Sequence, residues 1–171
     1  MSSLFACFPL HTNTKVPQTQ KPMTLNTGDP APDFTSTDQT GQPIKLSDYQ
    51  GKKVVLYFYP KDDTAGCTAQ ACSLRDNYSD LRAAGHEVIG VSVDNQTSHQ
   101  KFIGKYDLPF ALVADTDKQV VEAYGVWQEK SMYGRTYMGI TRTTFLIDES
   151  GIITDIIGKV DTKNHAGQIL K

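Results

Sequence analysis

Cysteine is scarce in this sequence, and its scarcity excludes one class of protein. Three cysteines occur in 171 residues, an odd number at a low density, so the chain is not a small secreted module held together by disulfides. Long apolar runs are also missing, because none approaches the ~18–20 residues of a membrane-spanning helix. We therefore expect a cytoplasmic protein with no membrane partner.

An excess of charge of one sign is absent as well. Seventeen lysine and arginine residues stand against nineteen acidic residues, and the net charge is −2. No basic cluster dominates any stretch, so we expect no nucleic-acid partner. Hydrophobic residues make up 39% of the chain, as in globular proteins, and the length suits a single domain with a sizeable core.

Acidic residues are missing from the first 28 positions, which also show little hydrophobic periodicity. The apolar stretch at residues 4–10 is interrupted by Pro9 and is too short for the core of a signal peptide. We predict that residues 1–22, with Cys7, form a disordered extension. Residues 23–171 are predicted to form the domain.

Beyond this extension, strand and helix patterns alternate. Apolar runs typical of buried strands lie at 54–59, 87–93, 111–114, 143–147 and 152–157. Helices are predicted over 68–84, from Thr97 or Ser98 to 106, over 118–124, and from about 164. Segments 34–37 and 43–45 flank a turn and predict an N-terminal β-hairpin. The order predicts an α/β domain whose central strands are joined by helical crossovers.

Two cysteines lie where a buried strand passes into a helix. Cys67 falls at the start of the predicted helix, where unpaired backbone N–H groups and the positive end of the dipole favour a thiolate. Gly66 allows the backbone to turn closely before the helix, and Thr64 places a hydroxyl three residues before Cys67. This segment lacks a fixed cation. Arg142, directly before strand 143–147, is the best candidate to reach the site from a neighbouring strand.

Each of these residues also has a purely structural interpretation. Cys72 has an alternative explanation in a place in the core, and Arg142 in a surface ion pair. Pro60 ends a strand, and Thr64 can stabilise a turn. The histidines of the domain have polar neighbours and are predicted to be solvated: His86, His99 and His165.

The block PxxxTxxC, here Pro60, Thr64 and Cys67, resembles the active-site signature of the peroxiredoxins. The second cysteine five residues on, Cys72, is followed by Leu-Arg-Asp and is similar to the bacterioferritin-comigratory, or Q-type, subfamily. The resemblance extends from about residue 23 to the end of the sequence. It includes the segments VVLYFYPKDDTAGCT, EVIGVSVD and TRTTFLID, the last of which contains the arginine.

The resemblance implies a thioredoxin-like fold with a central mixed sheet flanked by helices, and no metal or organic cofactor. It implies reduction of hydrogen peroxide and organic hydroperoxides, with thioredoxin or a similar dithiol as electron donor. Cys67 would be the peroxidatic cysteine and Cys72 the resolving one, joined in an intramolecular disulfide, with Pro60, Thr64 and Arg142 at the peroxide site. Because both cysteines lie on one chain, we expect a monomer.

Two departures from the family pattern are visible, Ala65 where proline is common and Gln70 where glutamate is common. Neither removes a catalytic group, although Ala65 loosens the loop. Two other functions compete with the peroxidase. A thioredoxin-type oxidoreductase uses a C-x-x-C spacing, whereas the spacing here is C-x-x-x-x-C. A metal-binding module is disfavoured because no further ligand follows at zinc-site spacing.

Overall fold

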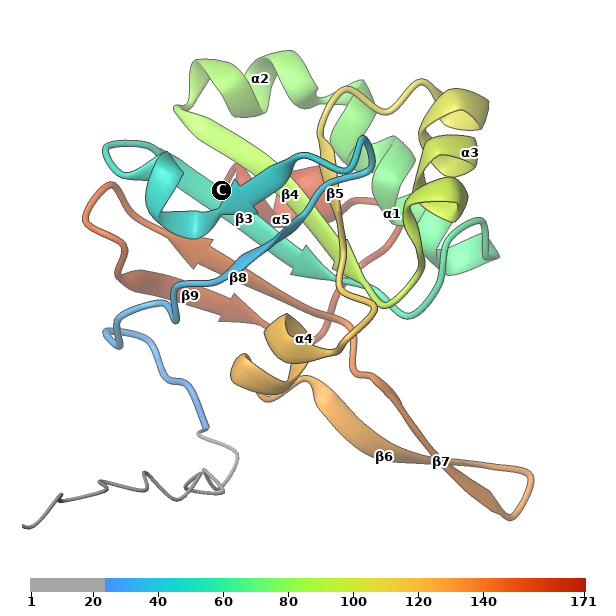
Figure 1. Ribbon diagram of the computed structural model, residues 1–171. Coiled ribbons are helices and arrows are strands. Elements are labelled where there is room, and N and C mark those ends of the chain that lie inside the picture. The colour runs from blue at the N-terminus through green and yellow to red at the C-terminus, as the bar shows by residue number, and fades with distance from the viewer. Residues whose placement is uncertain (1–23) are drawn as a thin grey trace, which may run out of the picture.

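A five-stranded mixed sheet forms the centre of the computed structural model, which describes residues 24–171 (Figure 1). Its strand order is β5-β4-β3-β8-β9. The parallel strands are β3 (Lys53–Phe58), β4 (His86–Ser92) and β5 (Ala111–Ala114). Two antiparallel strands complete the sheet, β8 (Thr143–Ile147) and β9 (Ile153–Ile157). The predicted α/β fold is therefore confirmed, while the predictions about residues 1–22 and Cys7 lie outside the described residues.

Strand β3 explains how the sheet joins two cores. Its side chains alternate, so Val54, Leu56 and Phe58 pack into one cluster and Val55 and Tyr57 into the other. A strand buried on both faces has no polar face, which is why its sequence is a continuous apolar run.

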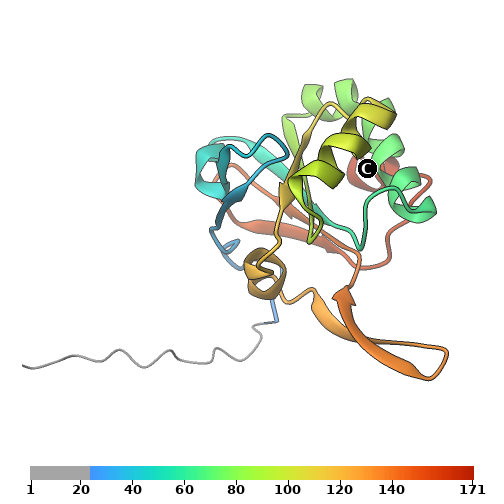
Figure 2. The ribbon, with the colours of Figure 1, turned by 45° about the vertical axis from the view of Figure 1, so that its right-hand side comes forward.

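Helices cover one face of the sheet, and smaller elements cover the other (Figures 1 and 2). The first face carries α1 (Ala65–Asp76), α2 (Tyr78–Ala83), α3 (Gln96–Tyr106) and α5 (His165–Ile169). The second carries α4 (Gln119–Ala123), a 3₁₀ helix (Leu46–Tyr49) and the predicted N-terminal hairpin of β1 (Thr35–Thr37) and β2 (Pro43–Lys45). None of the helices in this described part is long and apolar enough to cross a bilayer.

The helix predicted over 68–84 is divided in two by Asn77. This residue leaves helical geometry at φ −109° and ψ 17° and separates α1 from α2. Its side-chain amide donates to the Ser73 carbonyl at 2.9 Å. That bond satisfies a carbonyl at the end of α1, as helix ends require. The hydrophobic spacing continues across Asn77, so the sequence pattern did not reveal the break between the two helices.

A second hairpin, which the sequence analysis did not predict, leaves the body of the protein between α4 and β8. Strands β6 (Trp127–Met132) and β7 (Arg135–Ile140) pair only with each other. Apolar residues do not alternate along them because the hairpin projects from the core (Figure 2). Periodicity could not detect strands that have no buried face.

Helix α3 is capped by Asn95 and not by Thr97 or Ser98, the predicted caps. The Asn95 side chain accepts from the Ser98 backbone N–H at 2.9 Å. We predict that Asn95→Ala lowers the free energy of unfolding by about 1 kcal/mol, because it leaves that N–H without a partner. Urea denaturation measures the change. Thr97→Ala, at an exposed position in the same helical turn, is the control, and an equal loss in both variants would contradict the assignment.

Candidate active site

Cys67 lies in the first turn of α1, immediately after the loop that leaves β3 at the carboxyl edge of the parallel strands. Its side chain is only 2% exposed, whereas Cys72 is partly exposed, and both are free thiols. The position puts the Cys67 sulfur beside the unpaired N–H groups of the helix start. The predicted strand–loop–helix setting of the two cysteines is confirmed.

Arg142 reaches Cys67 from the neighbouring strand, as the sequence analysis expected. Strand β8 pairs antiparallel with β3, and Thr143 lies opposite Phe58, so the residue before β8 meets the loop after β3. The Arg142 Nη2 lies 3.3 Å from the Cys67 Sγ. A guanidinium at this distance stabilises negative charge on the sulfur.

Gln70 holds the arginine in this position, a role that the sequence analysis missed. Its Oε1 accepts from Arg142 Nη1 at 2.5 Å, and its side chain is fully buried. One turn of helix separates Gln70 from Cys67, so both side chains lie on the same side of α1 and contact the same guanidinium. The only available signal was its one-turn spacing from the cysteine.

Gly66 was predicted to allow a close turn of the backbone before the helix, but the structure gives it a different role. It lies within α1 and does not adopt a positive φ, so no unusual turn requires a glycine there. A Cβ atom at this position would lie 3.2 Å from Arg142 Nη2. The missing side chain therefore makes room for the guanidinium beside Cys67.

Thr64 occupies the N-cap position of α1, but its hydroxyl does not cap the helix. The Thr64 Oγ1 instead donates to the Lys61 carbonyl at 3.0 Å. Because that bond uses the hydroxyl hydrogen, the Thr64 oxygen remains available only as an acceptor. Pro60 is half-buried and directly follows Tyr59, whose N–H donates to the Val91 carbonyl at 3.1 Å. Pro60 thus ends the pairing of β3 and begins the loop.

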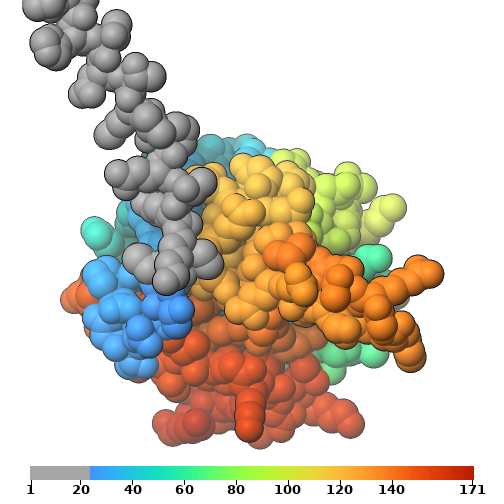
Figure 3. Space-filling view, turned by 90° about the horizontal axis from the view of Figure 1, so that it is seen from below, coloured from blue at the N-terminus to red at the C-terminus, as the bar shows by residue number. Residues whose placement is uncertain are grey.

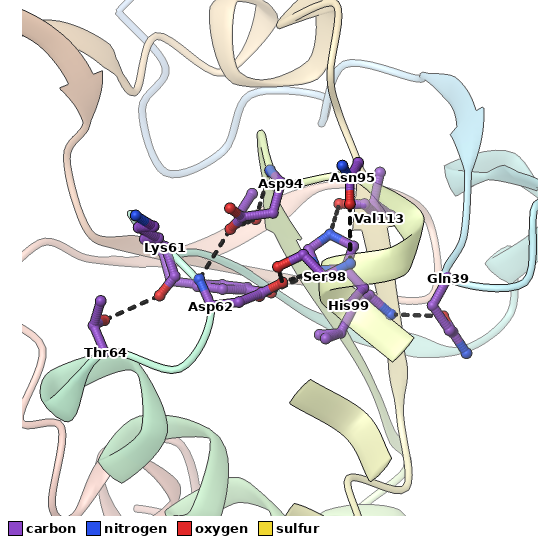
Figure 4. Close-up of polar contacts among 12 residues, drawn as sticks. Gln39, Lys61, Asp62, Thr64, Asp94, Asn95, Ser98, His99 and Val113 are labelled. Carbon is purple, nitrogen blue, oxygen red and sulfur yellow. Dashed lines mark hydrogen bonds and ion pairs between the residues drawn. The ribbon is translucent and has the colours of Figure 1, made fainter. Parts of the chain in front are cut away.

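A buried polar cluster fixes this loop to α3 and β5 (Figure 4). The Asp62 Oδ2 lies 2.7 Å from His99 Nδ1 and accepts from Ser98 Oγ at 2.7 Å. The His99 Nε2 lies 2.9 Å from the Val113 carbonyl, which only accepts, so this nitrogen carries a hydrogen. Tyr59 donates its hydroxyl to Asp62 Oδ1 at 2.6 Å. His99 is fully buried, and so is His165 in α5, so the prediction that these two histidines are solvated was wrong.

The next residue of the loop, Asp63, is tied to the same helix. It adopts a left-handed φ of 55° and accepts from Lys105 Nζ at 2.8 Å and from the Tyr106 hydroxyl at 2.7 Å. The bond from Lys105 and then that from Tyr106 lower the pKa of Asp63. The Asp62 N–H donates to Asp94 at 2.9 Å. The loop is therefore anchored at two successive residues.

Two further groups shape the electrostatics of the site. Tyr57 packs in the same buried cluster as Cys67, and burial, followed by the charge of Cys67, raises the pKa of its phenol well above the usual value. Lys130 comes from the second hairpin. Burial and the charge of Arg142 lower the pKa of Lys130, and the charge of Cys67 opposes this shift. The Cys67 thiol thus packs against buried core side chains, with cationic groups on one side.

Comparison with known proteins gives one consistent family. The AhpC/TSA family matches residues 27–156. The chain is 48% identical over 148 residues to the putative peroxiredoxin bcp of Coxiella burnetii, which covers 86% of this chain and 98% of that protein. It is 47% identical over 146 residues to peroxiredoxin Bcp of Escherichia coli strain K12, covering 85% and 94%.

Solved structures agree with the sequence relatives. A cysteine-to-serine mutant of Xylella fastidiosa PrxQ superposes with a TM-score of 0.81 at 32% identity, over 86% of this chain and 94% of that one. Peroxidoxin BcpB of Mycobacterium tuberculosis gives a TM-score of 0.75 at 34% identity, over 84% and 93%. These likenesses confirm the expected thioredoxin-like fold.

Proposed function

Because this chain belongs to the AhpC/TSA family and is a peroxiredoxin, we propose that it is a thiol peroxidase that uses Cys67 and Cys72 of one chain in turn. The observation that carries the proposal is the 3.3 Å contact between Arg142 Nη2 and Cys67 Sγ. A buried thiol has no structural need of a guanidinium, whereas a thiolate nucleophile does.

In the proposed first step, the Cys67 thiolate attacks the terminal oxygen of a hydroperoxide. The S–O bond forms as the O–O bond breaks, which leaves a Cys67 sulfenic acid and an alkoxide or hydroxide that takes up a proton. Negative charge moves from sulfur to the departing oxygen during this step. Arg142 can stabilise the negative charge both on the sulfur and on the departing oxygen. The Thr64 oxygen can accept a hydrogen bond from the peroxide, because the Thr64 hydroxyl hydrogen is donated to the Lys61 carbonyl.

In the second step, Cys72 attacks the Cys67 sulfur. The S–O bond breaks, water leaves with the thiol proton, and an intramolecular disulfide forms before further oxidation can occur. A dithiol protein of the thioredoxin type then supplies two electrons and two protons and restores both thiols. We propose hydrogen peroxide and organic hydroperoxides as substrates and a monomer as the working unit. Such a thiol cycle suits a reducing compartment such as the cytoplasm.

Formation of the disulfide requires α1 to open. Both cysteines lie in this helix, five residues apart. On an ideal helix, positions five apart have Cα atoms ~8.6 Å from each other and side chains ~140° apart around the axis. A disulfide does not bridge Cα atoms more than ~7 Å apart without movement of the backbone. Residues from about 66 to 73 must therefore leave helical geometry in the oxidised form.

The first prediction separates the two cysteines. Cys67→Ser should abolish peroxide turnover, because it removes the nucleophile. Cys72→Ser should still consume about one equivalent of peroxide per chain and then accumulate sulfenic or sulfinic acid at Cys67. Peroxide consumption and the mass of the Cys67 peptide measure these outcomes. Normal turnover in Cys67→Ser would contradict the assignment.

A second prediction concerns the guanidinium. Arg142→Lys keeps the charge but loses the fork of donors that spans Cys67 and Gln70. Its second-order rate constant with hydrogen peroxide should fall at least about tenfold, since one lost donor to a developing oxyanion costs that much or more. The rate of alkylation by iodoacetamide, which reports the thiolate, serves as the control and should change much less. Near wild-type peroxide kinetics would remove Arg142 from the site.

The third prediction follows from helix opening. Amide hydrogen exchange should show lower protection over residues 66–73 in the oxidised protein than in the reduced one. Strand β3 (Lys53–Phe58), buried on both faces, is the internal control and should not change. Equal protection of 66–73 in both redox forms would contradict the opening.

A further inference from the structure

The second hairpin carries an unusual concentration of exposed apolar side chains. Among residues 24–171, the large hydrophobic side chains classed as exposed are Met132, Tyr133, Tyr137 and Met138, at 55%, 99%, 44% and 49% exposure. All four lie on β6, β7 or the turn between them. The hairpin stands clear of the body of the protein (Figure 3). Exposed apolar side chains gathered on one element mark an interaction site more often than apolar residues scattered singly over a surface do.

The tip of the hairpin is built at a conformational cost. Tyr133 and Gly134 have φ values of 52° and 76° and join Met132 to Arg135 in a two-residue turn. Such turns favour asparagine before glycine, because a bulky side chain is strained at positive φ. Tyr133 is 99% exposed, so its side chain packs against nothing in residues 24–171. Nothing in this part of the chain compensates for placing a tyrosine there.

One face of the hairpin is continuous with the cysteine site. Lys130 lies opposite Tyr137, and Met132 opposite Arg135, so these four side chains share a face. The Lys130 and Tyr137 side chains lie over Gly139, at 3.4 and 3.3 Å from the place of its absent Cβ. Lys130 Nζ donates to the Ile140 carbonyl at the base of the hairpin. There the ammonium is within Coulombic range of Arg142 and Cys67.

We propose that Met132, Tyr133 and Tyr137, here called the inner face, form the docking surface for the dithiol protein that reduces the Cys67–Cys72 disulfide. The inference rests on the proposed function, because it names the surface used by that reductant. To break the disulfide, a thiolate of the partner must reach a sulfur of this chain, so the partner has to contact the protein around Cys67. The inner face shares its side of the hairpin with Lys130, whose ammonium lies at the hairpin base, near Arg142 and Cys67.

The size and chemistry of the inner face fit a brief encounter. Stable protein pairs bring together about 20–30 residues on each side, whereas weak redox encounters use small interfaces. Two six-residue strands and their turn supply fewer residues than a stable dimer needs. Tyrosine provides a large contact area with little loss of side-chain freedom, and methionine adapts its shape to different surfaces. A reductant that serves several protein disulfides needs contacts of this kind.

The test compares two electron donors on the full chain. Turnover is measured with thioredoxin and its reductase, and again with dithiothreitol, which needs no docking surface. The variants are the triple change Met132→Ser, Tyr133→Asn and Tyr137→Ser, and the single change Tyr133→Asn. Met138→Ser is the matched control, because Met138 lies opposite Glu129 on the other face of the same hairpin.

We expect the KM for thioredoxin to rise at least about tenfold in the triple variant, the loss typical of removing central interface side chains. Turnover with dithiothreitol should not change, and Met138→Ser should match the wild type in both assays. Tyr133→Asn should raise the KM without lowering the unfolding temperature, because asparagine suits the turn. If Tyr133 had a purely structural role, Tyr133→Asn would leave the KM unchanged and would lower the unfolding temperature.

Three results with the variants would overturn the inference. They are an unchanged KM in the triple variant, an equal rise in Met138→Ser, and a wild-type dimer that the triple variant converts to a monomer. Wild-type turnover with dithiothreitol but none with thioredoxin would also overturn it, while leaving the peroxidase intact. Loss of wild-type turnover with both donors would instead contradict the proposed function itself.

Discussion

The contact between Arg142 and Cys67 depends on a single strand pairing, and the rest of the site is arranged around it. The two residues are 75 positions apart and meet only because β8 lies antiparallel to β3 in one fixed register. A shift of one residue would turn the β8 side chains to the opposite face. The two cores that β3 joins specify this register, because each accepts only one set of its alternating side chains. Packing far from the sulfur therefore sets the 3.3 Å contact.

Around this fixed contact, the structure separates a rigid part from a part that can open. The loop before α1 is anchored to α3 through the side chains of Asp62 and Asp63, whose partners lie outside α1. The first turns of α1 instead owe their order to helical bonds, to the bonds from Arg142 to Cys67 and Gln70, and to packing of a few small side chains. The break at Asn77 separates them from α2. Local opening of α1 thus need not disturb the sheet, the loop or the next helix.

The sequence was sufficient where a physical signal was strong and local. Continuous apolar runs predicted the buried strands to within about a residue, and the chemistry of a cysteine at a helix start predicted the setting of Cys67. Arg142 was the best candidate for the cation because it directly precedes a buried strand, and the resemblance to the peroxiredoxins implied the same residue. The fold could be predicted because burial on two faces leaves a distinct mark in the sequence.

Other features left no such mark. Gln70 acts through one hydrogen bond across 72 positions, and apart from its one-turn spacing from Cys67 nothing in the sequence marks it as a partner of the arginine. His99 has polar neighbours along the chain, yet it is buried. The partners that satisfy its ring nitrogens, Asp62 and Val113, come from other elements and cannot be seen in its local sequence. The second hairpin has no core face and therefore no hydrophobic period. Long-range polar pairing and exposed strands are where single-sequence reasoning lacks a signal.

The antiparallel pairing at the base of the second hairpin has a consequence for how the chain can change in length. Ile140 is 1% exposed, and the Thr141 N–H donates to the Val126 carbonyl at 2.8 Å, so both ends of the hairpin are held. Residues inserted or deleted in pairs near Tyr133 would lengthen or shorten the hairpin without moving Arg142. One residue inserted between Ile140 and Thr143 would displace the guanidinium from the sulfur. Over evolution, the hairpin can vary its reach while the two residues before β8 keep a constant spacing.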